Sequence, residues 1–321
     1  MNGFMSLNLQ LLRVLETLRT PFGDSAMTAV TQLGEEAVFL LAALTVLWCV
    51  DKKKGYFLLT VSFGGLMINQ ILKLAFRIPR PWVLDSRLTI VEAARAGAEG
   101  WSFPSGHAQN AASLFGSIAV MTERKYLRVL CIIAAAAVAF SRMYLGVHTP
   151  LDVGVSLAVG ALLAIALYPS AAAETQREGG FLKLWLFFAL PLAAAFVVCT
   201  CVLRAYAQSE LAYYAAAVKN AWCMFGAIAG IILVDITDRS KLHFDTRAVW
   251  WAQILKVLLG AAFVMAVRAA LKAPLYALLG QSSGCADGVR YFLMVLAAGI
   301  VWPMSFPLFA RLGRPKCAGK Q

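Results

Sequence analysis

Long apolar segments follow one another along almost the whole chain, separated by short polar stretches. The mean hydropathy is +0.72, and 60% of the 321 residues are hydrophobic while only 14% are charged. Apolar runs near or above ~18 residues are long enough to cross a hydrocarbon core of about 30 Å as helices. We therefore predict an all-α fold, a polytopic membrane helix bundle with about nine transmembrane helices. The expected spans are residues 27–50, 55–76, 105–121, 126–142, 151–169, 183–203, 220–236, 248–271 and 289–310.

The N-terminal 26 residues have a different pattern. Leu7, Leu11, Val14, Leu15 and Leu18 recur at helical spacing with polar residues between them, which is typical of an amphipathic helix lying in the membrane interface. The stretch has no continuous apolar core and no basic start, so we do not expect a cleaved signal peptide.

The polar stretch at residues 171–182 predicts a boundary in the chain. It is expected to be a cytoplasmic linker. It separates a membrane core at residues 27–170, which contains all the polar motifs described below, from a C-terminal membrane domain at residues 183–321. That last domain is expected to have about four helices and has no recognisable chemical motif.

The basic residues predict the orientation of the chain. Lysine and arginine gather in alternate loops, at residues 52–54, 124–128, 177–183, 239–247 and 311–320, and such loops are retained on the cytoplasmic side. The chain is thus predicted to lie in the cell membrane with its N-terminus outside, its C-terminus in the cytoplasm and its polar motifs on the extracytoplasmic face. The net charge of +12 is explained by loops that face anionic lipid, so a nucleic-acid partner is not expected.

Five residues have the chemistry of a phosphate site. Lys73, Arg80 and Arg142 are cations at the ends of apolar runs, and they can bind a phosphate as a point charge and as planar forks. Ser105 and Gly106 precede a predicted helix, where Ser105 can cap the helix and the first backbone amides can bind an anion. Gly106 also allows the backbone to approach its ligand closely.

Three further residues can perform hydrolysis. His148 and Asp152 are four residues apart, so on a helical turn the carboxylate can bind one ring nitrogen and leave the other for attack. This arrangement suits a covalent phosphohistidine, with His107 protonating the leaving group and then activating water. The scheme requires no metal and no cofactor. The remaining histidine, His243, lies in a predicted cytoplasmic loop.

These residues form three ordered motifs that resemble those of the type 2 phosphatidic acid phosphatase (PAP2) family. The motifs are Lys73-x6-Arg80-Pro81, Pro104-Ser105-Gly106-His107 and Ser141-Arg142-x5-His148-x3-Asp152. The resemblance covers roughly residues 5–170, including residues 31–36, and leaves the second half unassigned. It implies a metal-independent lipid phosphatase with a helical core.

The resemblance also implies a role for each motif residue. His148 is the expected nucleophile, Asp152 its orienting partner and His107 the general acid and base. The remaining five residues, Lys73, Arg80, Ser105, Gly106 and Arg142, are expected to bind the substrate phosphate.

The first functional hypothesis is hydrolysis of a membrane lipid phosphate or diphosphate on the extracytoplasmic face. Undecaprenyl diphosphate is the first substrate to consider, followed by phosphatidic acid and phosphatidylglycerol phosphate. The alternative is a lipid transporter or scramblase that reuses the phosphate site for binding, with Lys256 and Arg268 in one helix as its support. A third reading gives the second half a docking role in a structural assembly.

Two further features have open interpretations. Glu35 and Glu36 are expected to be interface-level polar residues or a structural pair rather than catalysts. Lys256 lies deep in a predicted span, where an ionisable side chain usually faces a bundle interior or a cavity. Its expected roles are pairing with Asp235 or a second site.

Overall fold

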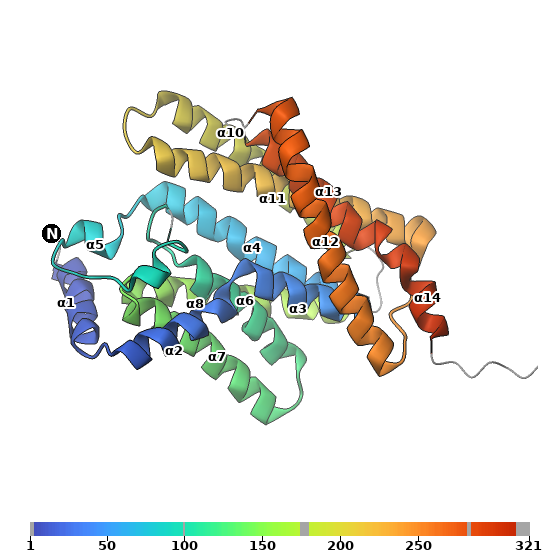
Figure 1. Ribbon diagram of the computed structural model, residues 1–321, viewed down its shortest axis with the longest axis horizontal. Coiled ribbons are helices and arrows are strands. Elements are labelled where there is room, and N and C mark those ends of the chain that lie inside the picture. Colours follow the sequence, from blue (N-terminus) through green and yellow to red (C-terminus); the bar gives the residue numbers. More distant parts are fainter. Residues whose placement is uncertain (1–2, 99, 174–179, 281–283, 313–321) are drawn as a thin grey trace, which may run out of the picture. The chain divides into compact units, whose positions relative to one another are not determined.

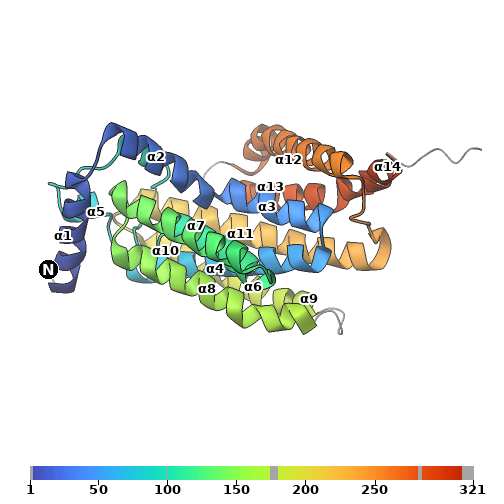
Figure 2. The ribbon, with the colours of Figure 1, turned by 90° about the horizontal axis from the view of Figure 1, so that it is seen from below.

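The computed structural model describes residues 3–98, 100–173, 180–280 and 284–312, and these residues form helices and loops without a strand (Figures 1 and 2). The prediction of an all-α helix bundle is confirmed. The longer helices are α1 (Gly3–Thr17), α2 (Pro21–Thr31), α3 (Glu36–Cys49), α4 (Lys52–Phe76), α6 (Gly106–Met121), α7 (Lys125–Tyr144), α8 (Pro150–Ala173), α10 (Leu190–Tyr206), α11 (Leu211–Thr237), α12 (Trp250–Leu279) and α13 (Cys285–Leu296). The shorter ones are α5 (Pro81–Leu84), α9 (Gly180–Leu184) and α14 (Phe306–Arg311).

Seven helical segments in the described residues are long and apolar enough to cross a membrane. An eighth results if Pro21–Gly34 and Glu36–Cys49, which are bent by 46° at their junction, form one broken span. The chain is a multi-span membrane protein, but the expected count of nine is not confirmed. The difference lies in α6, whose 16 residues rise only about 24 Å and fall short of a hydrocarbon core of about 30 Å.

The chain forms two compact units that alternate along the sequence. Unit 1 comprises Met1–Leu40, Phe57–Glu178 and Val198–Asn220. Unit 2 comprises Leu41–Tyr56, Gly179–Val197 and Ala221–Gln321. The domain boundaries expected from the sequence stay a prediction, and much of the expected linker at 171–182 lies outside the described residues.

The centre of unit 1 is α6, which packs against α7 and α8 (Figures 1 and 2). Small side chains on α6, among them Ala108, Ala112 and Ser113, are buried in this packing. A Cβ atom added to Gly160 of α8 would lie 2.5 Å from the Cβ of Ala112, so the two backbones approach as closely as small residues allow. This close packing fixes the starts of α6 and α8 relative to each other.

The predicted N-terminal helix is confirmed as α1. One face of it, with Leu9 and Leu12, packs against Leu88, and Arg13 donates to Asp85 over 3.0 Å from Nε to Oδ2. The hydrogen bond from Arg13 lowers the pKa of the Asp85 carboxyl to about 2. Three large apolar residues on α1 stay exposed, namely Leu7, Leu11 and Val14, and so does Leu18 directly after the helix. This exposed stripe supports the expected interfacial role, which stays a prediction.

Unit 2 contains a close helix crossing that depends on glycine. Gly226 and Gly230 are one turn apart on α11, and both face α13. A Cβ atom on Gly226 would collide with the backbone carbonyl of Gly288, and one on Gly230 would lie 2.8 Å from the Cβ of Val295. This small-xxx-small arrangement allows the two backbones to touch.

We predict that Gly226→Ala destabilises unit 2. The added methyl group meets backbone atoms that cannot rotate away, and overpacking of this kind costs about 1–3 kcal/mol. The measurement is the thermal unfolding midpoint in detergent. The matched control is Gly154→Ala in α8, because a Cβ atom there meets nothing within 4 Å. Equal midpoints for the two variants would contradict the prediction.

Candidate active site

All eight residues expected to form the site lie in unit 1, where the end of α4 and α7 and the start of α6 and α8 meet. Lys73 lies near the end of α4, Arg142 near the end of α7, and Asp152 in the first turn of α8. His148 lies in the short connection between α7 and α8. Arg80, Arg142, Lys73 and His107 all interact electrostatically with His148, so residues from all three motifs converge on one place.

His148 and Asp152 form a buried pair. Each is 1% exposed, and the His148 Nδ1 atom lies 3.4 Å from Asp152 Oδ2. Two shorter hydrogen bonds fix that carboxylate oxygen, one from the Ser102 hydroxyl at 2.6 Å and one from the Thr149 amide at 2.8 Å. Asp152 is therefore oriented by the backbone and by a loop serine before it acts on the histidine.

The other nitrogen of His148 contacts Arg80. The distance from Arg80 Nη1 to His148 Nε2 is 2.9 Å. A guanidinium only donates hydrogen bonds, so Nε2 must be the acceptor and carry no proton. Nδ1 then carries the proton of the neutral ring and faces Asp152. This tautomer presents a lone pair on Nε2, which a nucleophile needs.

Burial and the neighbouring cations lower the pKa of His148 well below its ordinary value. Burial is the larger cause, because it disfavours the charged imidazolium, and Arg80 is the strongest of the electrostatic ones. The nucleophilic form of the ring is thus favoured by its surroundings.

Backbone carbonyl groups of one loop accept hydrogen bonds from all three cations that are predicted to bind phosphate. Lys73 Nζ donates to the carbonyl oxygens of Trp101 at 2.6 Å and Ser102 at 3.4 Å. Arg80 Nε donates to that of Gly100 at 3.1 Å, and Arg142 Nη2 to that of Gly97 at 3.4 Å. The carbonyl acceptors are uncharged, so the cations keep their attraction for an anion.

Arg142 also has an unused donor. Its Nη1 atom donates to the Thr31 hydroxyl at 3.0 Å, while its buried Nε atom has no hydrogen-bond partner among the described residues. A buried guanidinium N–H without a partner is costly, and a bound phosphate oxygen would satisfy it.

The start of α6 is the remaining part of the phosphate site. Ser105 caps this helix, its hydroxyl accepting from the Ala108 amide at 3.4 Å. The Ser105 amide donates to the backbone carbonyl of Asp152 at 3.1 Å, which joins the second motif to the third. A Cβ atom on Gly106 would meet nothing within 4 Å. Open space therefore lies beside Gly106 at this helix start, where an anion could approach the first backbone amides.

His107 pairs with a carboxylate that the sequence analysis did not assign to the site. Its Nε2 atom lies 3.0 Å from Glu35 Oε1, and the Glu35 side chain is 41% exposed. The loop at Gly97 is adjacent, because a Cβ atom there would lie 3.4 Å from His107 Cε1. Glu35 is thus a partner of the predicted acid, although the sequence favoured a structural role at the interface.

Three further contributors were missed from the sequence: Ser102, Thr149 and Thr31. Ser102 and Thr149 lie within three residues of a motif residue but have no motif of their own. Thr31 and Glu35 fall in the stretch at residues 31–36, which was included in the family resemblance without a role. Their function depends on contacts over more than 70 residues of sequence, which spacing alone does not predict.

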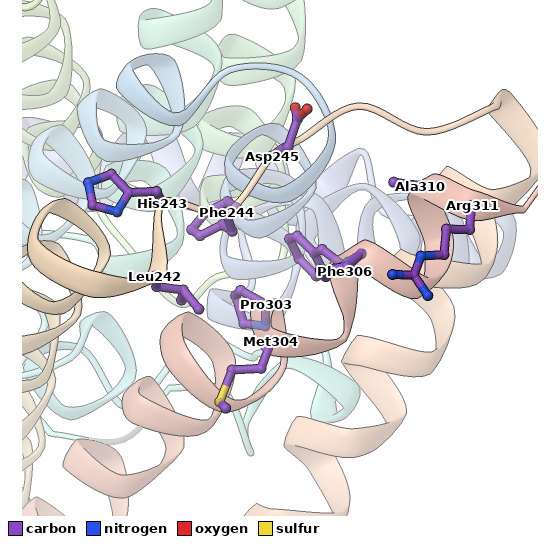
Figure 3. A pocket seen from close by; sticks show the side chains of 10 residues that line it. Leu242, His243, Phe244, Asp245, Pro303, Met304, Phe306, Ala310 and Arg311 are labelled. Atoms are coloured by element: carbon purple, nitrogen blue, oxygen red, sulfur yellow. The ribbon is translucent and has the colours of Figure 1, made fainter.

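Unit 2 contains a separate hollow of about 530 Å³ (Figure 3). Phe244, Pro303 and Phe306 line it, with His243 and Arg311 at its edges. Figure 3 shows the polar ends of these two side chains on different sides of the hollow, not directed at a common point. Lys256 lies nearby with its ammonium 4.4 Å from the Phe306 ring centre, and it donates to the Thr246 carbonyl at 3.0 Å. Asp235, its expected partner, forms an ion pair with Arg239 at 2.8 Å.

The geometry in unit 1 defines a class of protein. Three cations, a helix start and a histidine held neutral by burial make a phosphate-handling site in a multi-span membrane protein. Comparison with known families agrees, because residues 54–176 match the PAP2 superfamily and residues 218–314 match the PAP2 superfamily phosphatase transmembrane extension. The chain belongs to the PAP2 superfamily and is a phosphatase of that superfamily.

Known proteins are similar to about half of the chain. Phosphatidylglycerophosphatase B of Bacillus subtilis is 28% identical over 158 residues, which cover 46% of this chain and 74% of that protein. The undecaprenyl-diphosphatase of Sulfolobus acidocaldarius is 26% identical over 148 residues, covering 46% and 69%. The crystal structure of Aquifex aeolicus LpxE is 27% identical with a TM-score of 0.45, covering 51% of this chain and 95% of that one.

The lowered pKa of His148 predicts its titration. A lowered pKa means that the ring binds a proton only at lower pH, so His148 stays neutral at pH 6.5, the ordinary pKa of histidine. The measurement is a nuclear magnetic resonance titration of ring-labelled histidine in detergent. The chain has three histidines, and His148→Gln identifies the signal by its loss. A midpoint of 6.5 or above for that signal would contradict the prediction.

Proposed function

We propose that the protein hydrolyses a lipid phosphate or diphosphate through a phosphohistidine intermediate formed on His148. The observation that carries the proposal is the pair of contacts on this ring. Arg80 donates to Nε2 and Asp152 accepts from Nδ1, so the lone pair on Nε2 lies beside a phosphate-binding guanidinium. A structural histidine would need neither a fixed tautomer nor a neighbouring cation.

In the first step, the substrate phosphate binds to Lys73, Arg80, Arg142 and the start of α6. The lone pair of His148 Nε2 attacks phosphorus, an N–P bond forms, and the P–O bond to the leaving group breaks. The leaving oxygen takes a proton from His107 and departs as the lipid alcohol, or as the lipid monophosphate if the substrate is a diphosphate. Asp152 stabilises the positive charge that develops on the ring.

In the second step, His107 has lost its proton and acts as a general base. It takes a proton from a water molecule, whose oxygen attacks phosphorus while the N–P bond breaks. Inorganic phosphate leaves, and His148 returns to its neutral form. Fixed donors stabilise the phosphorus oxygens in both steps, so the scheme runs without a metal ion.

Undecaprenyl diphosphate is the first proposed substrate, followed by phosphatidic acid and phosphatidylglycerol phosphate. The names of two similar proteins, an undecaprenyl-diphosphatase and a phosphatidylglycerophosphatase, support this choice. A lipid substrate also suits a site at the end of apolar helices, because the phosphate can reach the cations while the tail stays in the bilayer.

The proposed site faces the extracytoplasmic side. Support comes from α7, which has Lys125 and Arg128 in its first turns and Arg142 in its last. Its 20 residues span about 30 Å, the thickness of a hydrocarbon core. The basic loop at the start of α7 is cytoplasmic under the positive-inside rule, so the site at the other end lies outside.

The test is phosphate release by purified protein in detergent with excess chelator. Undecaprenyl diphosphate, phosphatidic acid and phosphatidylglycerol phosphate are compared, with His148→Ala as the control variant. We expect chelator-resistant release that falls at least a thousandfold in the variant, roughly the loss typical of a missing nucleophile. Quenching in alkaline detergent during turnover should trap radiolabelled phosphate on wild-type protein, because the N–P bond of a phosphohistidine is stable to base and is hydrolysed by acid.

Two outcomes would overturn this proposal. Release that stops on chelation and returns with a divalent metal would contradict the metal-free scheme. Absence of release from every lipid would contradict hydrolysis itself, and lipid movement across vesicles that persists in His148→Ala would then favour the transporter.

Glu35 is predicted to support the acid step through His107. The carboxylate oxygen Oε1 lies 3.0 Å from Nε2 of His107, where it can accept a hydrogen bond and stabilise the imidazolium that must donate a proton. Glu35→Gln should lower kcat for a lipid phosphate about tenfold and change KM little. With p-nitrophenyl phosphate, whose leaving group needs little protonation, the loss should be much smaller.

The matched control is Glu36→Gln, which removes a charge one position away. An equal loss of kcat on both substrates in Glu35→Gln would indicate damage to the site as a whole. Such a result would contradict a role in the proton transfer.

A further inference from the structure

The second half of the chain returns to unit 1 through residues 198–220. The start of α11, residues 211–220, lies against the active-site loop. The ring centres of Tyr213 and Tyr214 are 5.6 Å and 5.3 Å from that of Trp101, and both pairs are edge-on. This is the favoured geometry for aromatic pairs.

Trp101 and Ser102 connect two parts of the active site. Their carbonyl oxygens accept both hydrogen bonds of Lys73, while the Ser102 hydroxyl donates to Asp152 at 2.6 Å. The Ser102 amide is itself bound to the Ile78 carbonyl at 2.8 Å. Movement of this dipeptide would therefore displace a phosphate-binding cation and the partner of the nucleophile together.

Aromatic contacts hold the Trp101 ring. The residue is 2% exposed, and its Nε1 atom has no hydrogen-bond partner among the described residues. Tyr214 is also buried, at 7% exposure. No hydrogen bond from Nε1 to a described residue orients the Trp101 side chain. Its orientation thus depends on the packing of its ring against the tyrosines of α11.

The start of α11 also contacts the helix that contains Lys73. Asn220 Nδ2 donates to Gln70 Oε1 at 3.4 Å, one turn before Lys73 on α4. The Arg77 guanidinium lies 5.6 Å from the Tyr214 ring centre, one turn after Lys73. The segment therefore contacts the chain on both sides of Lys73 in sequence, at Gln70 within α4 and at Arg77 directly after its end.

We infer that the start of α11 positions the active site: Tyr213 and Tyr214 fix the Trp101–Ser102 dipeptide, which sets the place of Lys73 and Asp152. The inference rests on the proposed function and gives the C-terminal half a part in it. Tyr213 and Tyr214 are positioning residues, since they act through Trp101. Both lie between the matched segments 54–176 and 218–314, so neither family match includes them.

The test compares Tyr213→Ala/Tyr214→Ala with Tyr213→Phe/Tyr214→Phe. The alanine pair removes the rings and should lower kcat about tenfold, because a small displacement of catalytic groups has large effects on rate. It should also weaken competitive inhibition by inorganic phosphate about tenfold, since Lys73 loses its place. The phenylalanine pair keeps the rings and should retain both values within about twofold.

Two controls separate positioning from folding. Tyr206→Ala removes a tyrosine that is 81% exposed and should change neither value. In a Lys73→Ala background, the alanine pair should add little further loss of phosphate inhibition, because coupled residues are not additive.

Full additivity in that background, or loss of both values in the phenylalanine pair, would overturn the inference. Unchanged kinetics in the alanine pair would do the same. Wild-type protein without phosphate release would instead contradict the proposed function. Isothermal titration of inorganic phosphate would then still compare the wild type with the alanine pair.

Discussion

The site depends on the way in which positive charge is held at the end of a membrane helix bundle. Burying cations such as Lys73, Arg80 and Arg142 there without hydrogen-bond partners would cost free energy. The usual partners of buried cations are carboxylates. Carbonyl oxygens of residues 97–102 accept hydrogen bonds from all three side chains. A carbonyl dipole satisfies a donor without cancelling its charge. The cations therefore remain available to an anionic ligand, and the backbone of one loop fixes their positions.

The carboxylate beside His148 has a distinct place. Asp152 is bound by Ser102 and Thr149 and lies on the far side of His148 from Arg80. A carboxylate aimed at the cations would compete with the substrate, whereas here it is aimed at the ring. The close crossing of α6 and α8 maintains this separation, because it joins the Ser105 amide to the Asp152 carbonyl. Small residues where α6 and α8 cross, such as Ala112 and Gly160, thus help to set the geometry of the site at the starts of these two helices.

The sequence predicted the helical class and the convergence of the motif residues, since hydropathy and short-range motifs report on local chemistry. Its count of nine spans is not confirmed, because the 16 residues of α6 are fewer than a full crossing usually needs. It did not predict the contact of Glu35 with His107 or that of Tyr214 with Trp101. These contacts join segments 72 and 113 residues apart by number, and nothing in the local pattern of either partner requires them. The catalytic and phosphate-binding roles of the motif residues stay predictions, and the structure brings those residues close enough together to perform them.

The contact between Arg80 and His148 has a consequence for selectivity. In the free protein the guanidinium covers the lone pair that would react. A neutral ester or an alkylating agent does not compete for the N–H groups of Arg80. The hydrogen bond from Arg80 to His148 Nε2 therefore stays in place. A phosphate anion competes for the same N–H groups and draws them away from the nitrogen. In the proposed mechanism, recognition of charge is thereby coupled to exposure of the reacting nitrogen, and an uncharged electrophile finds that nitrogen already hydrogen-bonded to Arg80.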